Sequence, residues 1–123
     1  MSDGPAWTVL DYERRPDEFP IRLFVGGLDG RNARDAAALC DLLAARGNEI
    51  RGTRSKLVEG QRNLFELRGH QVRIFYLFLP GRRIVLLDGI VKQQDRIPAA
   101  DLARVLGYQA DVERRGPAAP RGR

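Results

Sequence analysis

Three apolar runs between residues 64 and 92 constrain the fold more than any other part of the chain. They are Leu64–Arg68, Val72–Leu79 and Arg83–Val91, and each is rich in the residue types that favour strands. Turn residues separate them, Gly69-His70 in the first gap and Pro80-Gly81 in the second. Parallel neighbours need a long crossover, so these short gaps predict an antiparallel three-stranded meander.

Two-residue loops in both hairpins, the commonest arrangement, would fix the register of this meander. Arg73 would then lie opposite Glu66 on one side and Asp88 on the other. One face would be the core side: Phe65, Leu67, Val72, Ile74, Tyr76, Phe78, Val85, Leu87 and Val91. The other face would be a mixed surface: Glu66, Arg68, Arg73, Asp88 and Lys92 with Phe75, Leu77, Leu86 and Ile90. Its charges suit either a cross-strand ion-pair ladder or a functional site.

The rest of the chain predicts one more strand and several helices. Residues 7–12 read as an edge strand, 18–28 as an ambiguous helix, and 32–46 as a clear helix with Asn32 as its N-cap. Pro98 opens a short helix that Gly107 ends. We therefore expect an α+β fold in which a small antiparallel sheet, the N-terminal strand plus the meander, packs against N-terminal helices and a short C-terminal helix. Residues 1–112 would form a single domain and 113–123 a disordered basic tail.

Composition narrows the classes of function without choosing one. The chain has 123 residues, 43% hydrophobic and 30% charged, with a net charge of +5. Such a basic domain either binds a polyanion or is a protein that is rich in arginine without such a partner. The single cysteine, Cys40, falls on an apolar helix stripe, and with one histidine it makes no zinc site. The sequence shows no signal peptide and no apolar run that spans a membrane, so we expect a cytoplasmic protein without a cofactor.

Residues 48–63 are polar and basic. Arg51, Arg54, Lys56 and Arg62 cluster there, just before the meander. They fit a solvated connector or a rim that contacts phosphates. Spacing alone leaves both interpretations open.

The order of elements and several local patterns resemble the RelE/ParE toxin superfamily, in particular its phage-derived, HigB-like branch. The patterns are Lys56-Leu57, Gly60, Leu64–Arg68, Val72–Tyr76, Arg83–Lys92 and Ile97-Pro98. The resemblance covers about residues 7–110 and is sharpest from 56 to 98.

This resemblance implies the toxin of a type II toxin–antitoxin pair. RelE-like and HigB-like members cleave mRNA at the ribosomal A site without a metal. A small helix-turn-helix antitoxin neutralises them, and operator DNA is bound only through that complex. The matching positions here are Lys56, Glu66, Arg68, Arg73, Tyr76 and Lys92. Arg73 best matches the family's phosphate-contacting arginine, and Lys92 matches the first of its paired lysines, whereas Gln93 stands at the second.

Metal-free RNA cleavage by attack of the 2′-hydroxyl on the adjacent phosphate fits these residue types. A guanidinium grips two phosphate oxygens, so Arg68 and Arg73 suit the charge that develops there. Lys56 and Lys92 could add positive charge, and Glu66 is a base or orients Arg73. The candidate catalytic residues are thus Arg73, Arg68, Lys92, Lys56 and Glu66, and the candidate RNA-binding residues are Arg51, Arg54, Arg62 and Gln93. His70 is either a further catalytic group or an exposed hairpin residue.

Two alternatives remain open. A ParE-like member would inhibit DNA gyrase by binding and cleave nothing, and an inactive relative would only bind RNA. The glutamine at position 93 favours the inactive relative, and the arginine and lysine set favours a nuclease. In either toxin we expect the antitoxin to cover the mixed face of the meander or to displace the C-terminal helix.

Overall fold

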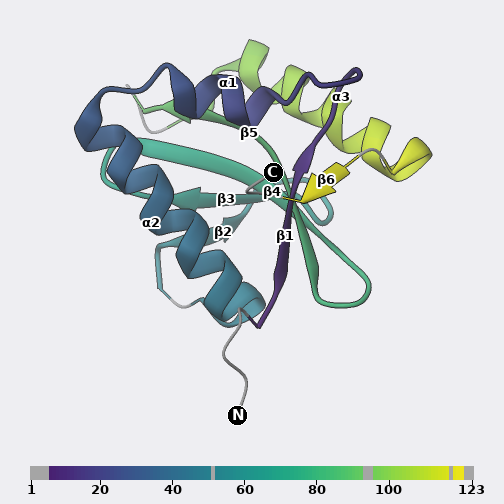
Figure 1. Cartoon of the computed structure of the whole chain (residues 1–123), viewed down its shortest axis with the longest axis horizontal. Coiled ribbons are helices and arrows are strands. Elements are labelled where there is room, and N and C mark those ends of the chain that lie inside the picture. Colours follow the sequence, from purple (N-terminus) through teal and green to yellow (C-terminus); the bar gives the residue numbers. More distant parts are fainter. Residues whose placement is uncertain (1–5, 51, 93–95, 117, 121–123) are drawn as a thin grey trace.

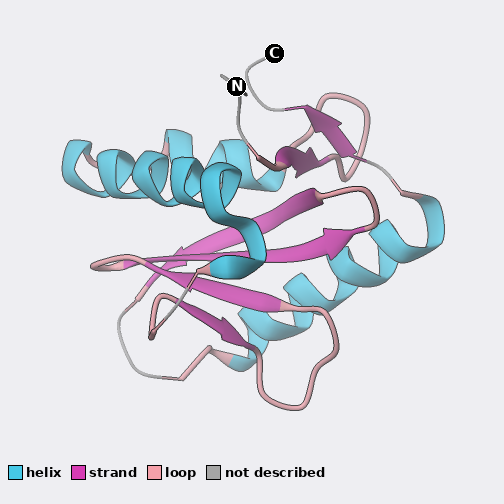
Figure 2. Cartoon of the chain, turned by 90° about the horizontal axis from the view of Figure 1, so that it is seen from below, coloured by secondary structure: helices cyan, strands magenta, loops and turns pink. Residues whose placement is uncertain are grey.

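The computed structural model describes residues 6–50, 52–92, 96–116 and 118–120, and it has the expected α+β class (Figure 1). A six-stranded sheet has helices on both of its faces (Figure 2). The elements in chain order are β1 Thr8–Tyr12, α1 Pro20–Gly26, α2 Gly30–Arg46, a 3-10 turn Gly47–Glu49, β2 Ser55–Leu57, β3 Phe65–Arg68, β4 Val72–Leu79, β5 Arg83–Val91, α3 Ala99–Arg115 and β6 Ala118–Pro120.

The strands lie in the order β2-β3-β4-β5-β1-β6. The predicted meander is confirmed, because β3, β4 and β5 pair antiparallel in sequence order. The expectation of a wholly antiparallel sheet is wrong, because β1 runs parallel to β5 with Thr8 opposite Arg83. Helices α1 and α2 and the three strands β2, β3 and β4 lie between β1 and β5 in the chain, so the connection is long enough for a parallel pair.

The first hairpin turns one residue later than expected. Arg68 lies opposite Arg73, and the Gly69 N–H donates to the Val72 carbonyl at 2.9 Å. The carboxylate of Asp35 on α2 accepts from the N–H of His70 at 2.9 Å, which ties the turn to the helix. A Cβ at Gly69 would lie 2.2 Å from Asp35 Oδ2, so only glycine permits this approach.

The second hairpin has a three-residue turn instead of the expected two. Leu79 lies opposite Arg83, with Gly81 and Arg82 in the left-handed region at φ 83° and 56°. The register shifts again between Phe75 and Tyr76, where β5 carries one extra residue.

These shifts overturn the predicted Glu66–Arg73–Asp88 ladder. Glu66 lies opposite Phe75, and Arg73 lies opposite Arg68 on one side and Ile90 on the other. The three-residue turn of the second hairpin also exchanges the predicted faces of β5. Ile84 and Leu86 belong to the core on the α1 and α2 side, and Val85 and Leu87 belong to the core on the α3 side.

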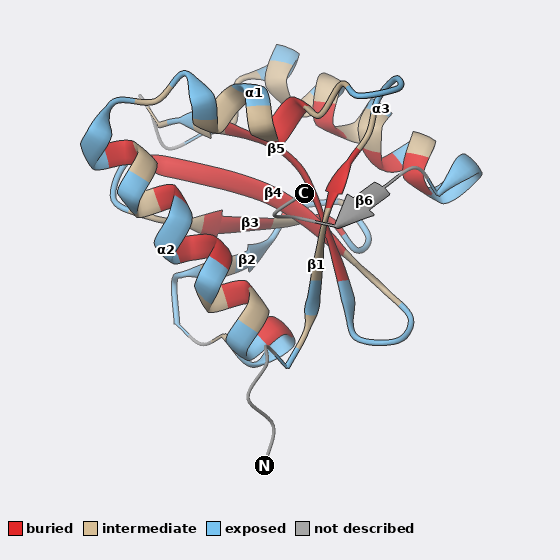
Figure 3. Ribbon diagram, in the orientation of Figure 1, coloured by how far each residue is buried: buried red, intermediate tan, exposed pale blue. Residues whose placement is uncertain are grey.

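The expected mixed surface does not exist, because both faces of the central strands are buried (Figure 3). Helices α1 and α2 cover one face, with Ile21, Leu39 and Leu43 packed among the meander's Leu67, Val72, Ile74 and Tyr76. Helix α3 covers the other, where Val105 and Val112 pack on Phe75 and Leu77. Phe75 is fully buried and Leu77 is 1% exposed, so neither is available to a partner.

The helix boundaries differ from the predicted ones at both ends of the chain. Asp29, and not Asn32, is the N-cap of α2, with its carboxylate accepting from the Asn32 N–H at 2.8 Å. Helix α3 passes through Gly107 and ends at Arg115, followed by Gly116, whose φ of 70° suits a C-terminal glycine. The predicted tail from 113 is therefore helical to Arg115, and residues 118–120 pair with β1. Residues 117 and 121–123 lie outside the described part.

Within the described ranges, no helix is both long enough and apolar enough to cross a membrane.

Candidate functional site

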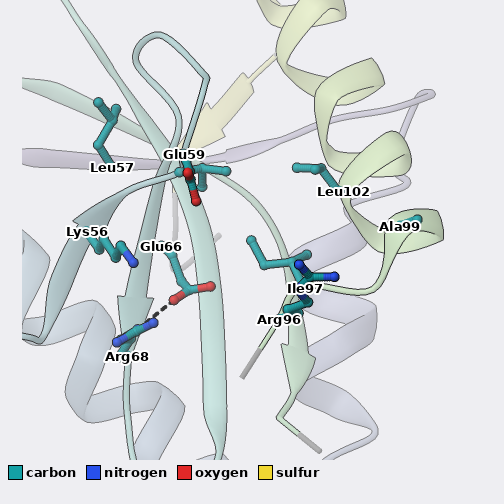
Figure 4. A pocket seen from close by; sticks show the side chains of 10 residues that line it. Lys56, Leu57, Glu59, Glu66, Arg68, Arg96, Ile97, Ala99 and Leu102 are labelled. Atoms are coloured by element: carbon teal, nitrogen blue, oxygen red, sulfur yellow. Dashed lines mark hydrogen bonds and ion pairs between the residues drawn. The ribbon is translucent and has the colours of Figure 1, made fainter. Parts of the chain in front are cut away.

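A cleft of about 520 Å³ opens where the sheet extends beyond the cover of α3 (Figure 4). The short edge strand β2 pairs with β3, and the two form one wall. Residues 96–102, which lead into α3 and form its first turn, supply the other. We call this the β2–β3 cleft; its lining is Lys56, Leu57, Val58, Glu59, Glu66, Arg68, Arg96, Ile97, Ala99 and Leu102.

An ion pair and a lysine stand together in the β2–β3 cleft. Arg68 Nε donates to Glu66 Oε1 at 2.6 Å, and the two side chains project from the same face of β3. The Glu66 side chain is 8% exposed and that of Arg68 is 32% exposed. Lys56 lies opposite Glu66 on β2 and extends toward the pair (Figure 4). Burial strengthens the Glu66–Arg68 attraction, which holds the guanidinium at the mouth of the cleft.

A second cavity of about 460 Å³, the hairpin hollow, adjoins the cleft through Arg68. Its lining is Asp35, Thr53, Arg54, Arg68, Gly69, His70 and Arg73. Arg73 is only 8% exposed, and its Nη1 donates to the carbonyls of Gly69 at 3.0 Å and Val72 at 3.1 Å. Arg73 thus secures the first hairpin turn besides reaching the hollow.

A third cavity of about 600 Å³, the α3 entrance hollow, adjoins the cleft through Arg96. Its lining is Phe24, Gly89, Ile90, Val91, Lys92, Arg96, Pro98, Asp101 and Arg104. Arg104 is oriented by two carboxylates, Asp88 at 2.9 Å and Asp101 at 2.8 Å. Desolvation opposes and these bonds favour the charged guanidinium, with a net rise in the pKa of Arg104.

The predicted catalytic residues therefore divide among three adjoining cavities. Lys56, Glu66 and Arg68 share the β2–β3 cleft, whereas Arg73 and Lys92 line the hairpin hollow and the α3 entrance hollow. Sequence reasoning missed Arg96 and Arg104, because neither belongs to a strand pattern or a basic cluster in the sequence.

The four predicted RNA-binding residues do not share one site. Arg54 lines the hairpin hollow. Arg62 lies on the loop from β2 to β3, outside the lining of the cleft, where Gln109 Nε2 donates to its carbonyl at 2.8 Å. Arg51 and Gln93 lie outside the described residues.

Tyr76 has a structural role. It is fully buried, and its hydroxyl lies 2.6 Å from Ser55 Oγ. Burial raises the pKa of Tyr76, so the phenol is a poor proton donor here. Tyr76 was predicted on the core face of the meander, and the structure confirms that it packs there.

Comparison with known families gives one clear match. The family described as phage derived protein Gp49-like (DUF891) matches residues 24–107, which span the chain from α1 into α3 and include all three cavities' arginines and lysines named above. No curated protein matches the sequence. Because the match covers more than half of the chain, the protein belongs to the phage-derived Gp49-like family, a toxin-like family of the RelE/HigB type.

Proposed function

We propose that the chain is the toxin of a type II toxin–antitoxin pair and that it cleaves mRNA on the ribosome as a metal-free endonuclease. The Glu66–Arg68 pair beside Lys56 in the β2–β3 cleft is the observation that carries this proposal. A base, a phosphate-binding cation and a second cation then share one cavity. Attack of the 2′-hydroxyl of RNA on the adjacent phosphate needs these three groups.

The roles follow from the positions of these side chains. Glu66 takes the proton of the 2′-hydroxyl, whose oxygen attacks the adjacent phosphorus. Arg68 uses its Nε to hold Glu66 and has two terminal nitrogens with which to grip the phosphate as its negative charge grows. Lys56 gives a proton to the departing 5′-oxygen. The products are a 2′,3′-cyclic phosphate and a 5′-hydroxyl, and Glu66 and Lys56 then exchange their protons with water.

The neighbouring cavities would hold the RNA on either side of the scissile bond. Arg54 and Arg73 stand in the hairpin hollow, and Lys92 and Arg96 stand in the α3 entrance hollow. Arg68 and Arg96 belong to two cavities each, so a phosphate backbone could pass through all three without leaving positive charge.

A small helix-turn-helix antitoxin remains the partner we propose, with a changed site. The expected surface with Phe75 and Leu77 is buried under α3, so an antitoxin would reach it only by displacing that helix. The β2–β3 cleft combines Lys56 and Arg68 with Leu57, which is 47% exposed. An acidic segment with apolar side chains fits that lining. Co-purification with the product of an adjacent gene tests this, and loss of the complex in Leu57→Asp, but not in Leu23→Asp on α1, would support the cleft.

Induced expression in bacteria tests the function. We expect growth arrest with new mRNA 5′ ends within translated regions, carrying 5′-hydroxyl groups. Arg68→Ala should abolish both effects, and Arg34→Ala, which removes an exposed arginine of α2, should abolish neither. Growth arrest without new 5′ ends, accompanied by loss of DNA supercoiling, would favour the gyrase-binding alternative.

A further inference from the structure

A fourth cavity, remote from the β2–β3 cleft, is surrounded by arginines. It lies between the end of β1 with the turn that follows it and the side of α3 turned away from the cleft, and its volume is about 640 Å³. We call it the tyrosine–arginine hollow; its lining is Tyr12, Arg14, Arg15, Ala103, Arg104, Gly107, Tyr108, Asp111, Arg114 and Arg115.

Asp111 organises the charges of this hollow. Its carboxylate accepts from Tyr12 Oη at 2.5 Å, from Arg114 Nη2 at 2.8 Å and from Arg115 Nε at 2.6 Å. Hydrogen bonds from Arg115 first and from Tyr12 next hold the pKa of Asp111 well below its usual range, so the carboxylate stays charged. The two arginines are thus held at the rim while remaining accessible, since the Arg114 side chain is 73% exposed and that of Arg115 48%.

Positive charge exceeds negative charge around this cavity. The lining holds five arginines and one carboxylate. Glu18, Asp88 and Asp101 pair with Arg14 and Arg104 from outside the lining. Arg15 makes no ion pair with any residue in the part of the chain that the structure describes.

The chemistry of the lining favours nucleic acid over protein as the ligand. All its cations are guanidinium groups, which match two phosphate oxygens at a time. Tyr12 and Tyr108 are in tilted ring contact, with centroids 5.0 Å apart, and Tyr108 is partly exposed, so a base could stack on its open face. The only aliphatic side chain in the lining is Ala103, whereas a protein interface needs a larger apolar centre.

The hollow is connected to the proposed cleavage site by shared arginines. Arg96 lines both the β2–β3 cleft and the α3 entrance hollow, and Arg104 lines both the α3 entrance hollow and the tyrosine–arginine hollow. A strand that left the cleft around the start of α3 would therefore meet a guanidinium at each boundary.

We infer that the tyrosine–arginine hollow is a second binding site for the RNA phosphate backbone, which grips the strand outside the cleavage site. This inference rests on the proposed function, because it takes the strand in the β2–β3 cleft to be RNA. The hollow would add affinity without base specificity, since its groups face phosphates and one ring surface.

Binding of the intact chain to a single-stranded 2′-O-methyl RNA tests the site separately from cleavage, because this RNA has no 2′-hydroxyl to attack. The dissociation constant is measured between about 50 and 200 mM salt. In Arg15→Ala/Arg114→Ala, the slope of log affinity against log salt should become shallower by about 1.4, the value for two lost contacts to a single strand. Arg15→Lys/Arg114→Lys should keep the wild-type slope.

Arg31→Ala/Arg34→Ala is the matched control, since it removes the same charge from exposed positions of α2. Its slope should equal that of the wild type. Equal slopes for the wild type and Arg15→Ala/Arg114→Ala, or an equal loss in the α2 control, would overturn the second site. A chain that binds in this way and still fails to cut RNA would contradict the nuclease and leave the site standing.

Discussion

Arg68 is the side chain on which the proposed reaction depends most. Arg68→Ala should lower RNA cleavage per folded molecule by about 10²–10³, the usual loss for one group that stabilises transition-state charge. Arg68→Lys should restore only part of the activity, because an ammonium cannot bind Glu66 and two phosphate oxygens in one plane. The assay counts folded protein by circular dichroism, since the unpaired Glu66 should also cost about 1–3 kcal/mol of stability. Wild-type cleavage by folded Arg68→Ala would remove Arg68 from the mechanism.

Arg73 has a structural role that its place in the sequence concealed. The alternation of side chains along the strand predicted Arg73 on an open face, where its truncation would leave the fold intact. In the structure the residue is only 8% exposed, and its guanidinium donates to two carbonyls of the first hairpin. Arg73→Ala should therefore lower the free energy of unfolding by about 1–3 kcal/mol, because those buried acceptors lose a charged donor. Urea denaturation measures this; a midpoint equal to that of the wild type would contradict the structural role.

Tyr12 makes stability depend on pH at the alkaline end. Burial, and then its hydrogen bond to Asp111, raise the pKa of Tyr12 to about 12. The unfolded value is about 10, so the folded state holds the phenol proton more tightly. This contribution is fully present below about pH 10 and is lost as the pH rises from about 10 to about 12.

Tyr12→Phe should remove that part of the alkaline loss. Its urea midpoint should fall less than that of the wild type between about pH 8 and about pH 11. Burial also raises the pKa values of Tyr76 and Tyr108, so a residual alkaline loss should persist. Parallel curves for the two proteins would show that Tyr12 does not couple to folding.

Among the elements, α3 departs most from its prediction. Gly107 predicted the end of a helix. The helix continues because Val105 before this glycine and Val112 after it both pack on the sheet. Gly107 is exposed, and a Cβ there would meet nothing within 4 Å. Gly107→Ala should therefore stabilise the protein by about 0.5–1 kcal/mol, through the lower entropy of the unfolded chain.

Gly116→Ala is the matched control for that helix. The same change at φ 70° should destabilise, since alanine adopts the left-handed region at a cost of about 1–2 kcal/mol. Thermal melting of both variants should shift in opposite directions, and a destabilised Gly107→Ala would contradict the continuous helix.

The sequence predicted β1, β3, β4 and β5, but not the direction of β1, the hairpin registers or the short strands β2 and β6. Runs such as Val72–Leu79 are recognised as strands by their residue types, and the short gaps between runs require antiparallel neighbours. No local signal tells whether β1 runs with or against β5, because the two are distant in the chain. The turn at His70 also depends on Asp35 from α2, which no reading of the hairpin itself could include.

The site was predictable residue by residue and not as a cavity. Glu66 and Arg68 could be chosen from a strand pattern and Lys56 from a basic cluster, and all three match the family resemblance. Arg96 and Arg104 reach the same surface only because α3 crosses the sheet and leaves β2 and β3 uncovered. That covering is a property of the packed molecule, and so is the burial of the face that was expected to be open.

At the scale of the whole molecule, an excess of arginines surrounds α3 on two sides. The net charge of +5 is compatible with any polyanion. The arginines that line the four cavities, however, follow one route from the hairpin hollow to the tyrosine–arginine hollow. The molecule would then contact RNA over a longer stretch than the cleavage site alone. Loss of Arg73 would lower stability as well as RNA binding, whereas loss of the exposed Arg114 would lower RNA binding alone.

Cleavage of mRNA on purified ribosomes is the most direct test of the proposed nuclease. Ribosomes programmed with a defined mRNA are incubated with the chain, and primer extension maps new ends. We predict cuts within the codon at the A site by the wild type, a loss of about 10²–10³ in rate for Arg68→Ala, and wild-type cutting by Arg34→Ala. Absence of cuts by folded wild-type protein, or equal cutting by Arg68→Ala, would contradict this prediction.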